Sequence, residues 1–362
     1  MKTITLTILA LLLLSACASQ PEAVAPIKIG IIAATTGPVA YIGTPEMQGA
    51  LLAVKELNSA GSNIELIVED SPCDPPKAVT AFKKLAEVDK VDYIIGPSCS
   101  FENMAVAPIA EDMKIPVIAL GAQEELANVG AFTIPFSALP SDQGEKLADY
   151  LTAQGYRKAG AIYFSGPYTK QIAEGLKKGF LENNGEFMLN EELSDFSKTD
   201  FRDVALKAMD KGIDAVYIEP FGQEATVIRQ FTELGYKGKI VFGENGYRKD
   251  VAEIPAAESL VVVTYQALTN GKYDEFHTSF VKEYGEPGQP FNAAMAYDAV
   301  KLIYQLKDIP KEQLKETIIS NGNSGASGTL QYQNGQPHRD FLIYRIVSNK
   351  FVPENSSGRG AV

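Results

Sequence analysis

Residues 27–38 read IKIGIIAATTGP, and this stretch decides the fold. The β-branched run at its start predicts a strand, which the Gly37-Pro38 pair ends. Residues 45–60 follow with apolar side chains at helical spacing, and residues 64–68 are again strand-like. A strand, a helix and a second strand in this order predict a parallel sheet of βαβ units.

The same alternation continues along the chain, so the fold class is expected to be α/β. Asp74 before Pro75-Pro76 predicts a helix start, because Asp caps a helix and Pro fits its first turn. Further strands are expected at residues 93–95, 116–120, 158–164, 215–218, 240–242 and 260–264, and further helices at residues 101–113, 169–183, 201–211 and 224–234. The segments form two sets, near 27–135 and 142–264, which predicts two similar Rossmann-like lobes with parallel central sheets.

The C-terminal part of the chain predicts how the lobes are connected. Helices are expected at residues 273–284, 292–306 and 311–319, and short strands near residues 329–332 and 341–347. Three helices without a sheet of their own would most simply pack on the first lobe. The expected domains are residues 27–136 plus about 266–330 for lobe 1, and residues 137–265 plus about 331–362 for lobe 2. Several crossings would form a hinge, with a ligand cleft between the carboxyl ends of the two sets of strands.

Composition excludes several classes of function. The chain has 362 residues with 45% hydrophobic and 22% charged residues, so it is expected to be globular. A formal net charge of -12 would repel phosphate backbones, which argues against nucleic acid as a partner. Two His and three Cys leave little material for a zinc or redox centre, so no metal and no cofactor are expected.

The N-terminus predicts export. One charge, Lys2, precedes an apolar run over residues 4–14, which is shorter than the roughly 20 residues needed to span a bilayer. The run ends in LSAC at residues 14–17, which resembles a lipobox, so residues 1–16 are expected to be a lipoprotein signal peptide and Cys17 the lipidated residue. The alternative is an ordinary signal peptide cut near Ala18. Residues 17–26 then read as a flexible tether, and the protein is expected to be exported and held at the membrane by its lipid anchor only.

Cys73 and Cys99 are the cysteines that remain if Cys17 is lipidated. In an exported protein they are a candidate disulfide pair. Two free buried thiols are the alternative, because sequence does not show whether the two Cα atoms lie within bridging distance.

Several motifs resemble the leucine/isoleucine/valine-binding protein family, the type I extracytoplasmic solute-binding proteins of ABC importers. They are TGPVAYIG at residues 36–43, VEDSPCDPPKAV at 68–79, YIIGPSCS at 93–100 and IPVIALGA at 115–122. The resemblance continues through residues 166–168, 199–201 and 214–217 and covers nearly all of the mature chain. It implies the type I periplasmic-binding-protein fold, and it strengthens the disulfide, since the two cysteines match the family's disulfide positions.

The resemblance also implies first-lobe residues that bind an amino acid. Ser100 lies between a strand and a helix, where its hydroxyl and the first helical N–H groups can hold a carboxylate; the alternative is that it only caps the helix. Gly121, Ala122 and Gln123 match the second carboxylate-binding loop, although Thr is common at the Gln123 position. Ile42 flanks a cleft position where an aromatic residue is common.

From the second lobe, Tyr168 and Phe221 match aromatic cleft positions, with plain surface or core aromatics as the alternative. The family's ammonium-binding Glu aligns with Asn245, so the sequence departs from the pattern there. Glu244 beside it and Glu219 at the end of the preceding strand are the candidate carboxylates.

The resulting prediction is a solute-binding lipoprotein, not an enzyme, which captures an amino acid or similar small polar solute and delivers it to the transmembrane subunits of an ABC permease. A two-lobed envelope lipoprotein that acts as a ligand sensor or protein-interaction regulator is the alternative. Ser100 with His277 or His338 is not expected to form a hydrolase site, because no G-x-S-x-G elbow surrounds the serine.

Overall fold

The computed structural model describes residues 25–265 and 271–354 of the chain. The expected signal peptide at residues 1–16, the expected lipidation site Cys17 and the tether up to residue 24 lie outside the described residues. Across the described ranges, the structure contains no helix that is long and apolar enough to cross a membrane.

The first sheet has five parallel strands in the order β2-β1-β3-β4-β5. Their bounds are β1 (Ile27–Ala33), β2 (Ile64–Asp70), β3 (Tyr93–Ile95), β4 (Val117–Ala119) and β5 (Thr133–Pro135). Alternate residues of β1 face opposite sides: Ile31 belongs to the large central core, and Ile32 packs with Phe82 and Val106 on the other side. Because both faces are covered, the strand is apolar almost throughout.

The second sheet has seven strands in the order β15-β14-β10-β9-β8-β6-β7. Their bounds are β6 (Lys158–Phe164), β7 (Glu186–Leu193), β8 (Ala215–Glu219), β9 (Lys239–Phe242), β10 (Val261–Tyr265), β14 (Phe341–Val347) and β15 (Lys350–Glu354). Strands β7, β6, β8, β9 and β10 are parallel and repeat the order of the first sheet, whereas β14 and β15 are antiparallel additions. The predicted α/β fold with two similar parallel sheets is confirmed.

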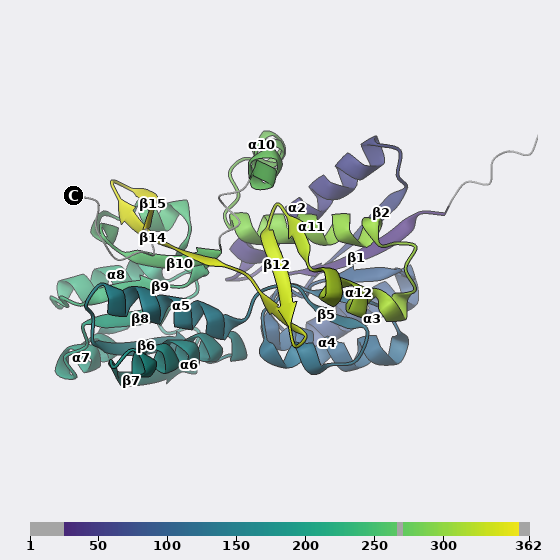
Figure 1. Cartoon of the computed structure of the whole chain (residues 1–362). Coiled ribbons are helices and arrows are strands. Elements are labelled where there is room, and N and C mark those ends of the chain that lie inside the picture. Colours follow the sequence, from purple (N-terminus) through teal and green to yellow (C-terminus); the bar gives the residue numbers. More distant parts are fainter. Residues whose placement is uncertain (1–24, 266–270, 355–362) are drawn as a thin grey trace, which may run out of the picture.

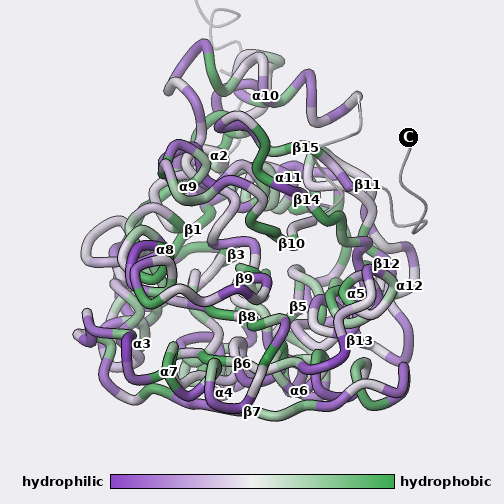
Figure 2. The backbone as a smooth tube through the Cα atoms, turned by 90° about the vertical axis from the view of Figure 1, so that its left-hand side faces the viewer, coloured by the Kyte–Doolittle hydropathy of each residue, from purple (hydrophilic) through white to green (hydrophobic). Residues whose placement is uncertain are grey.

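Helices cover both sheets, which form two halves side by side in Figure 1. The α-helices are α2 (Ala40–Ser59), α3 (Pro75–Lys83), α4 (Ser100–Met113), α5 (Pro140–Ala153), α6 (Pro167–Glu182), α7 (Arg202–Asp210), α8 (Glu224–Glu233), α9 (Lys249–Ala252), α10 (Gly271–Tyr284), α11 (Pro290–Gln305) and α12 (Leu314–Asn321). A π-helical segment (Lys84–Asp89) extends α3, and short 3-10 turns lie at Glu124–Asn128, Glu244–Gly246, Pro255–Ala257 and Lys311–Gln313. Figure 2 shows the most hydrophobic stretches along the strands and the hydrophilic ones at peripheral loops and helix surfaces.

The late helices pack on the first half, as the sequence predicts. Helix α11 lies along α2 in Figure 1, and the two backbones approach closely. A Cβ on Gly49 of α2 would lie 2.0 Å from the carbonyl oxygen of Ala293 in α11, so only glycine fits there.

Two expectations about individual elements were wrong. Strand β7 was not predicted, because EFMLNEEL carries three glutamates and lies at the edge of the sheet, where few side chains are buried. Helix α2 begins at Ala40 and not at Pro45; the proline lies inside the helix, one turn after its start.

A small antiparallel sheet adjoins the crossings between the halves. Its strands are β11 (Asn323–Gly325), β12 (Gly328–Gln333) and β13 (Gln336–His338). The first and last crossings contact each other, since the Leu139 N–H donates to the carbonyl of Pro337 at 3.2 Å. Buried Arg339 donates to the carbonyl of Phe136 at 3.0 Å and to that of Ser327 at 2.8 Å, so one guanidinium ties the crossing segments together.

Candidate functional site

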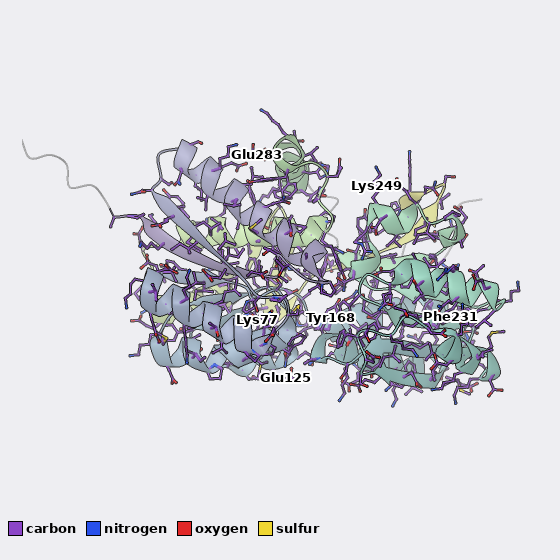
Figure 3. The ribbon with its side chains drawn as sticks, turned by 180° about the vertical axis from the view of Figure 1, so that it is seen from behind. Lys77, Glu125, Tyr168, Phe231, Lys249 and Glu283 are labelled. Carbon is purple, nitrogen blue, oxygen red and sulfur yellow. A yellow bond between two sulfur atoms is a disulfide. The ribbon has the colours of Figure 1, made fainter. Side chains whose placement is uncertain are left out.

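A cavity of about 320 Å³ lies between the carboxyl ends of the two parallel sheets. Figure 3 shows Tyr168, one of its wall residues, at the junction of the two halves. Of the binding residues predicted from sequence, the cavity is lined by Ile42, Ser100, Gly121, Ala122, Tyr168, Phe221, Glu244 and Asn245. The structure thus brings residues from both halves to one cavity, at the edge where open α/β sheets bind ligands.

The first-sheet rim of the cavity is the N-terminus of α4. Cys99 is the N-cap residue and Ser100 the first helical residue, so Ser100 is not the cap that the alternative interpretation assumed. Within the described residues, the Ser100 hydroxyl and the N–H groups of Ser100 and Phe101 have no hydrogen-bond acceptor. Free N–H groups at a helix N-terminus attract an anion.

Gly121 keeps this helix end accessible. A Cβ at position 121 would lie 2.6 Å from the backbone nitrogen of Ser100, so any other side chain would fill the space in front of it. The glycine therefore allows the loops that follow β3 and β4 to approach each other closely.

A disulfide between Cys73 and Cys99 joins the loop after β2 to the N-cap of α4, with Cα atoms 5.5 Å apart. Glu102 lies on the same side: its Oε1 accepts from the Asp74 N–H at 2.8 Å and its Oε2 from the Cys99 N–H at 3.3 Å. These contacts tie the first-sheet rim to its neighbouring loop.

Glu244 is the carboxylate of the opposite, second-sheet rim. It follows β9, is 9% exposed, and accepts hydrogen bonds from the Tyr168 hydroxyl and from Gln143 Nε2, the latter at 2.7 Å. Burial raises the pKa of Glu244, although the two hydrogen bonds oppose the shift. Among the described residues that line the cavity there is no Lys, Arg or His, and Glu244 supplies the carboxylate.

Glu219 and Gln123, which the sequence analysis included in the site, do not line the cavity. Glu219 ends β8 and lies beneath Gly243, where its carboxylate accepts from the Tyr217 hydroxyl at 3.0 Å. Burial first, and then the negative charge of Glu244, raise the pKa of Glu219 well above its ordinary value. Gln123 is buried at the start of the 3-10 turn Glu124–Asn128, one residue past the lining loop.

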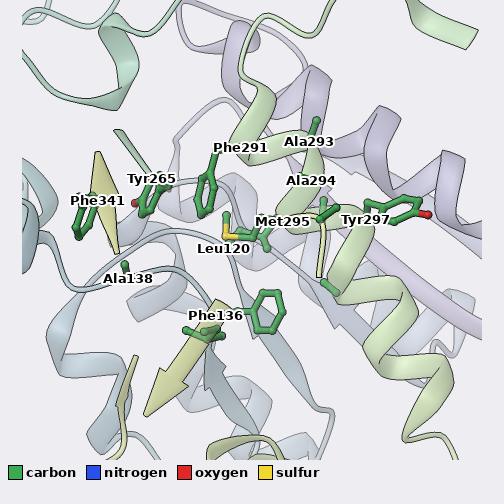
Figure 4. Close-up of a cluster of buried hydrophobic side chains, with 14 of the residues drawn as sticks. Leu120, Phe136, Ala138, Tyr265, Phe291, Ala293, Ala294, Met295, Tyr297 and Phe341 are labelled. Atoms are coloured by element: carbon green, nitrogen blue, oxygen red, sulfur yellow. The ribbon is translucent and has the colours of Figure 1, made fainter. Parts of the chain in front are cut away.

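The base of the cavity comes from residues that the sequence analysis missed. Tyr265 at the end of β10 stacks on Phe291 of α11, with ring centroids 3.6 Å apart, and both line the cavity. Figure 4 shows this pair in a row with Phe341 and beside Met295. Residues from the two halves therefore meet in one apolar cluster, which no local sequence pattern reveals.

A second feature is the aromatic wall, which we define as Phe164, Phe196 and Phe221; the sequence analysis predicted Phe221 and missed the other two. The Phe164 and Phe196 rings stack with centroids 4.9 Å apart, and Phe196 lies 6.3 Å from Phe221. All three line the cavity, and Phe221 has a positive φ of 41°.

Glu46 is a buried carboxylate behind the first-sheet rim. It accepts hydrogen bonds from the Ser98 hydroxyl and, at 3.2 Å, from Asn292 Nδ2, and both donors line the cavity. Complete burial raises the pKa of Glu46 to about 7, against the opposing effect of the two hydrogen bonds.

Polar contacts also join the halves around the cavity. Gln171 of α6 donates to Glu125 Oε2 at 3.0 Å, and the Arg248 guanidinium lies 4.5 Å from the centre of the Tyr41 ring. Arg248 is itself held by Glu224 at 3.0 Å. These contacts hold the two halves together beside the cavity.

The sequence profile of the family described as Periplasmic binding protein matches residues 26–350. The chain belongs to this family. Periplasmic binding proteins bind solutes and are not enzymes, and the predicted resemblance to the leucine/isoleucine/valine-binding proteins is confirmed.

Two curated relatives illustrate the similarity. The Leu/Ile/Val-binding protein of Escherichia coli K12 is 27% identical over 246 residues, which cover 65% of this chain and 66% of that protein. The leucine-, isoleucine-, valine-, threonine- and alanine-binding protein of Pseudomonas aeruginosa is 24% identical over 345 residues, covering 90% and 91%.

Solved structures share the fold of this periplasmic binding protein. A leucine-binding protein from Thermotoga maritima has a TM-score of 0.80 at 24% identity, covering 91% of this chain and 97% of that one. A solute-binding protein from R. palustris in complex with benzoate has a TM-score of 0.79 at 21% identity, covering 91% and 95%.

Proposed function

We propose that this periplasmic binding protein closes its two lobes on a zwitterionic amino acid. The ligand carboxylate lies at the N-terminus of α4, near Ser100 and Gly121, and its ammonium pairs with Glu244. The observation that carries the proposal is the pairing of these two sites in one cavity: unpartnered backbone and hydroxyl donors on one rim face a buried carboxylate on the other.

The charge of the cavity supports an ammonium group in the ligand. A carboxylate ligand without an amine would leave Glu244 without a cationic partner, or would require its protonation, since the described lining residues include no basic side chain. The names of the amino-acid-binding relatives agree with a ligand that carries an ammonium group. The benzoate-bound structure is an example of a protein that binds a carboxylate without an amine.

In this proposal Tyr168 orients Glu244, whereas Asn245, Ile42 and Ala122 contact the ligand and Phe221 contributes to its apolar end. Gln123 and Glu219 do not line the cavity, and in this proposal neither contacts the ligand. The lobes that close are residues 27–136 with about 266–330, and residues 137–265 with about 331–362.

Delivery to an ABC permease, export, and anchoring through a lipid on Cys17 complete the proposal. The hydrogen bond between Gln171 and Glu125 joins the two halves beside the cavity, which supports a receptor that presents a ligand-dependent shape to its permease.

A thermal-shift screen of the exported protein tests the proposal. A ligand at 100 times its Kd stabilises the native state by about 2.7 kcal/mol, so an amino acid that binds raises the melting temperature measurably. The proposal predicts a shift with one or more L-amino acids. Absence of any shift with amino acids, together with one for a carboxylate that has no amine, would contradict it.

A further inference from the structure

The aromatic wall lies at the end of the cavity away from Glu244. Along the second sheet, Glu244 follows β9, Phe221 follows β8, Phe164 ends β6 and Phe196 follows β7, in the spatial order β9-β8-β6-β7. Neighbouring strands are about 4.8 Å apart, so β9 and β6 are separated by roughly 10 Å. The side chains of this rim thus change from a carboxylate to phenyl rings over a distance comparable to the length of a small molecule.

The first-sheet rim also contributes apolar side chains to the cavity. Pro38, Val39 and Pro72 line the cavity from the loops after β1 and β2 of the first sheet. None of these side chains can form a hydrogen bond with a ligand. A ligand group that packs against these side chains and the aromatic wall is favoured when it is apolar.

Phe196 is the unusual member of the wall. It is 54% exposed, and among the exposed large hydrophobic residues of the described ranges it is the one that lines the cavity. A local turn holds it, since Asp195 Oδ1 accepts from the Ser197 N–H at 2.9 Å and the Asp195 carbonyl from the Lys198 N–H at 3.0 Å. A half-exposed phenyl ring on the wall of a binding cavity gains apolar contact when a ligand covers it.

We infer that Phe196 determines specificity by contacting the ligand's side chain, and that this side chain is an aromatic ring. The inference rests on the proposed function, because it assumes that the ammonium lies at Glu244. The stacked Phe164–Phe196 pair, with an interplanar angle of 17°, offers ring faces and edges to a third ring. The cavity volume of about 320 Å³ lies within the usual range of small-molecule binding sites.

Calorimetry with L-phenylalanine and L-leucine tests the inference on the wild-type protein and on Phe196→Leu, Phe196→Ala and Leu206→Ala. The matched control, Leu206, is 52% exposed on α7 and does not line the cavity. Wild type should bind phenylalanine roughly 2- to 12-fold more tightly than leucine. This range corresponds to the free energy that an aromatic pair contributes in addition to the burial of its apolar area. Phe196→Leu should remove most of that preference, Phe196→Ala should weaken phenylalanine binding roughly tenfold, and Leu206→Ala should change neither.

Two outcomes overturn the inference and leave the proposed function intact: a wild-type preference for leucine, or phenylalanine binding that is equal in wild type and Phe196→Ala. Melting temperatures of the variants verify that they fold. No binding of any amino acid would overturn the proposed function and the inference with it.

Discussion

The two rims of the cavity use different means to hold a ligand. The first-sheet rim consists of backbone N–H groups, Ser100 and Gly121, and a disulfide ties it to its neighbouring loop. The second-sheet rim consists of side chains: the carboxylate of Glu244 and the rings of the aromatic wall. In the proposed site, the first-sheet rim holds the anion mainly with backbone N–H groups and adds the Ser100 hydroxyl, whereas side chains of the second-sheet rim set the charge and selectivity.

The largest effect is expected on the second-sheet rim. Glu244→Gln should weaken amino-acid binding by about 2 to 5 kcal/mol, because the ligand ammonium then lies in the cavity without its charged partner. Calorimetry measures this, with Glu219→Gln as the matched control, since Glu219 is buried behind the cavity wall. If both variants bind amino acids like wild type, the ammonium assignment is wrong.

The disulfide distinguishes the first-sheet rim from the second. Replacing Cys73 and Cys99 together by Ser should lower the free energy of unfolding by roughly 3 to 4 kcal/mol, the chain-entropy value for a loop of 26 residues. Denaturant titration of the two proteins measures the difference. Equal stability, or two alkylatable thiols in the unreduced wild type, would contradict the bond in the exported protein.

Glu46 gives the first-sheet rim its own pH dependence. Its pKa is about 7 in the native protein against an ordinary value of 4.5, so between these pH values the native state holds a proton that the unfolded state has lost. Stability should therefore fall as pH rises from about 4.5 to 7, by up to about 3 kcal/mol, and then level off.

Glu46→Gln removes the titrating group and should flatten this part of the stability profile. Denaturant titrations at a series of pH values measure it, with Glu65→Gln, an exposed carboxylate of β2, as the control. An unchanged slope in Glu46→Gln would show that other groups carry the pH dependence.

The smallest effect is expected at Ser100. Ser100→Ala should weaken ligand binding by about 1 to 3 kcal/mol, because one ligand oxygen loses its hydroxyl donor. The melting temperature without ligand should stay unchanged, since Cys99 and not Ser100 is the N-cap. Unchanged affinity with a lower melting temperature would favour a purely structural role.

The two rims also differ in how far the sequence predicted them. The order of strands and helices on the first lobe follows from the spacing of apolar residues and from the Pro and Gly residues that end these elements. The loops at Ser100 and Gly121 belong to motifs of consecutive residues, which can be recognised in the sequence. Strand β3 of the first sheet has the predicted bounds, residues 93–95. Backbone sites are predictable because a strand end and a helix start define them locally.

The second-sheet rim was only partly predicted, for a physical reason. Phe196 follows the polar edge strand β7, which the sequence analysis did not recognise, so nothing placed its loop beside Phe164. Tyr265 and Phe291 meet only because the late helices return to the first lobe. Glu219 and Glu244 both lie at the carboxyl ends of their strands, so the sequence does not show which of them lines the cavity. The structure shows that Glu219 is packed beneath Gly243.

Calorimetry with matched ligands tests the central claim, that the cavity binds a zwitterion between a backbone anion site and Glu244. L-Phenylalanine and L-leucine are compared with 3-phenylpropanoate and 4-methylpentanoate, which keep the side chain and carboxylate and lack the amine. The account predicts that the better-bound amino acid loses at least about 30-fold in affinity when its amine is removed, which corresponds to about 2 kcal/mol. Equal or tighter binding of the deaminated acid would contradict it.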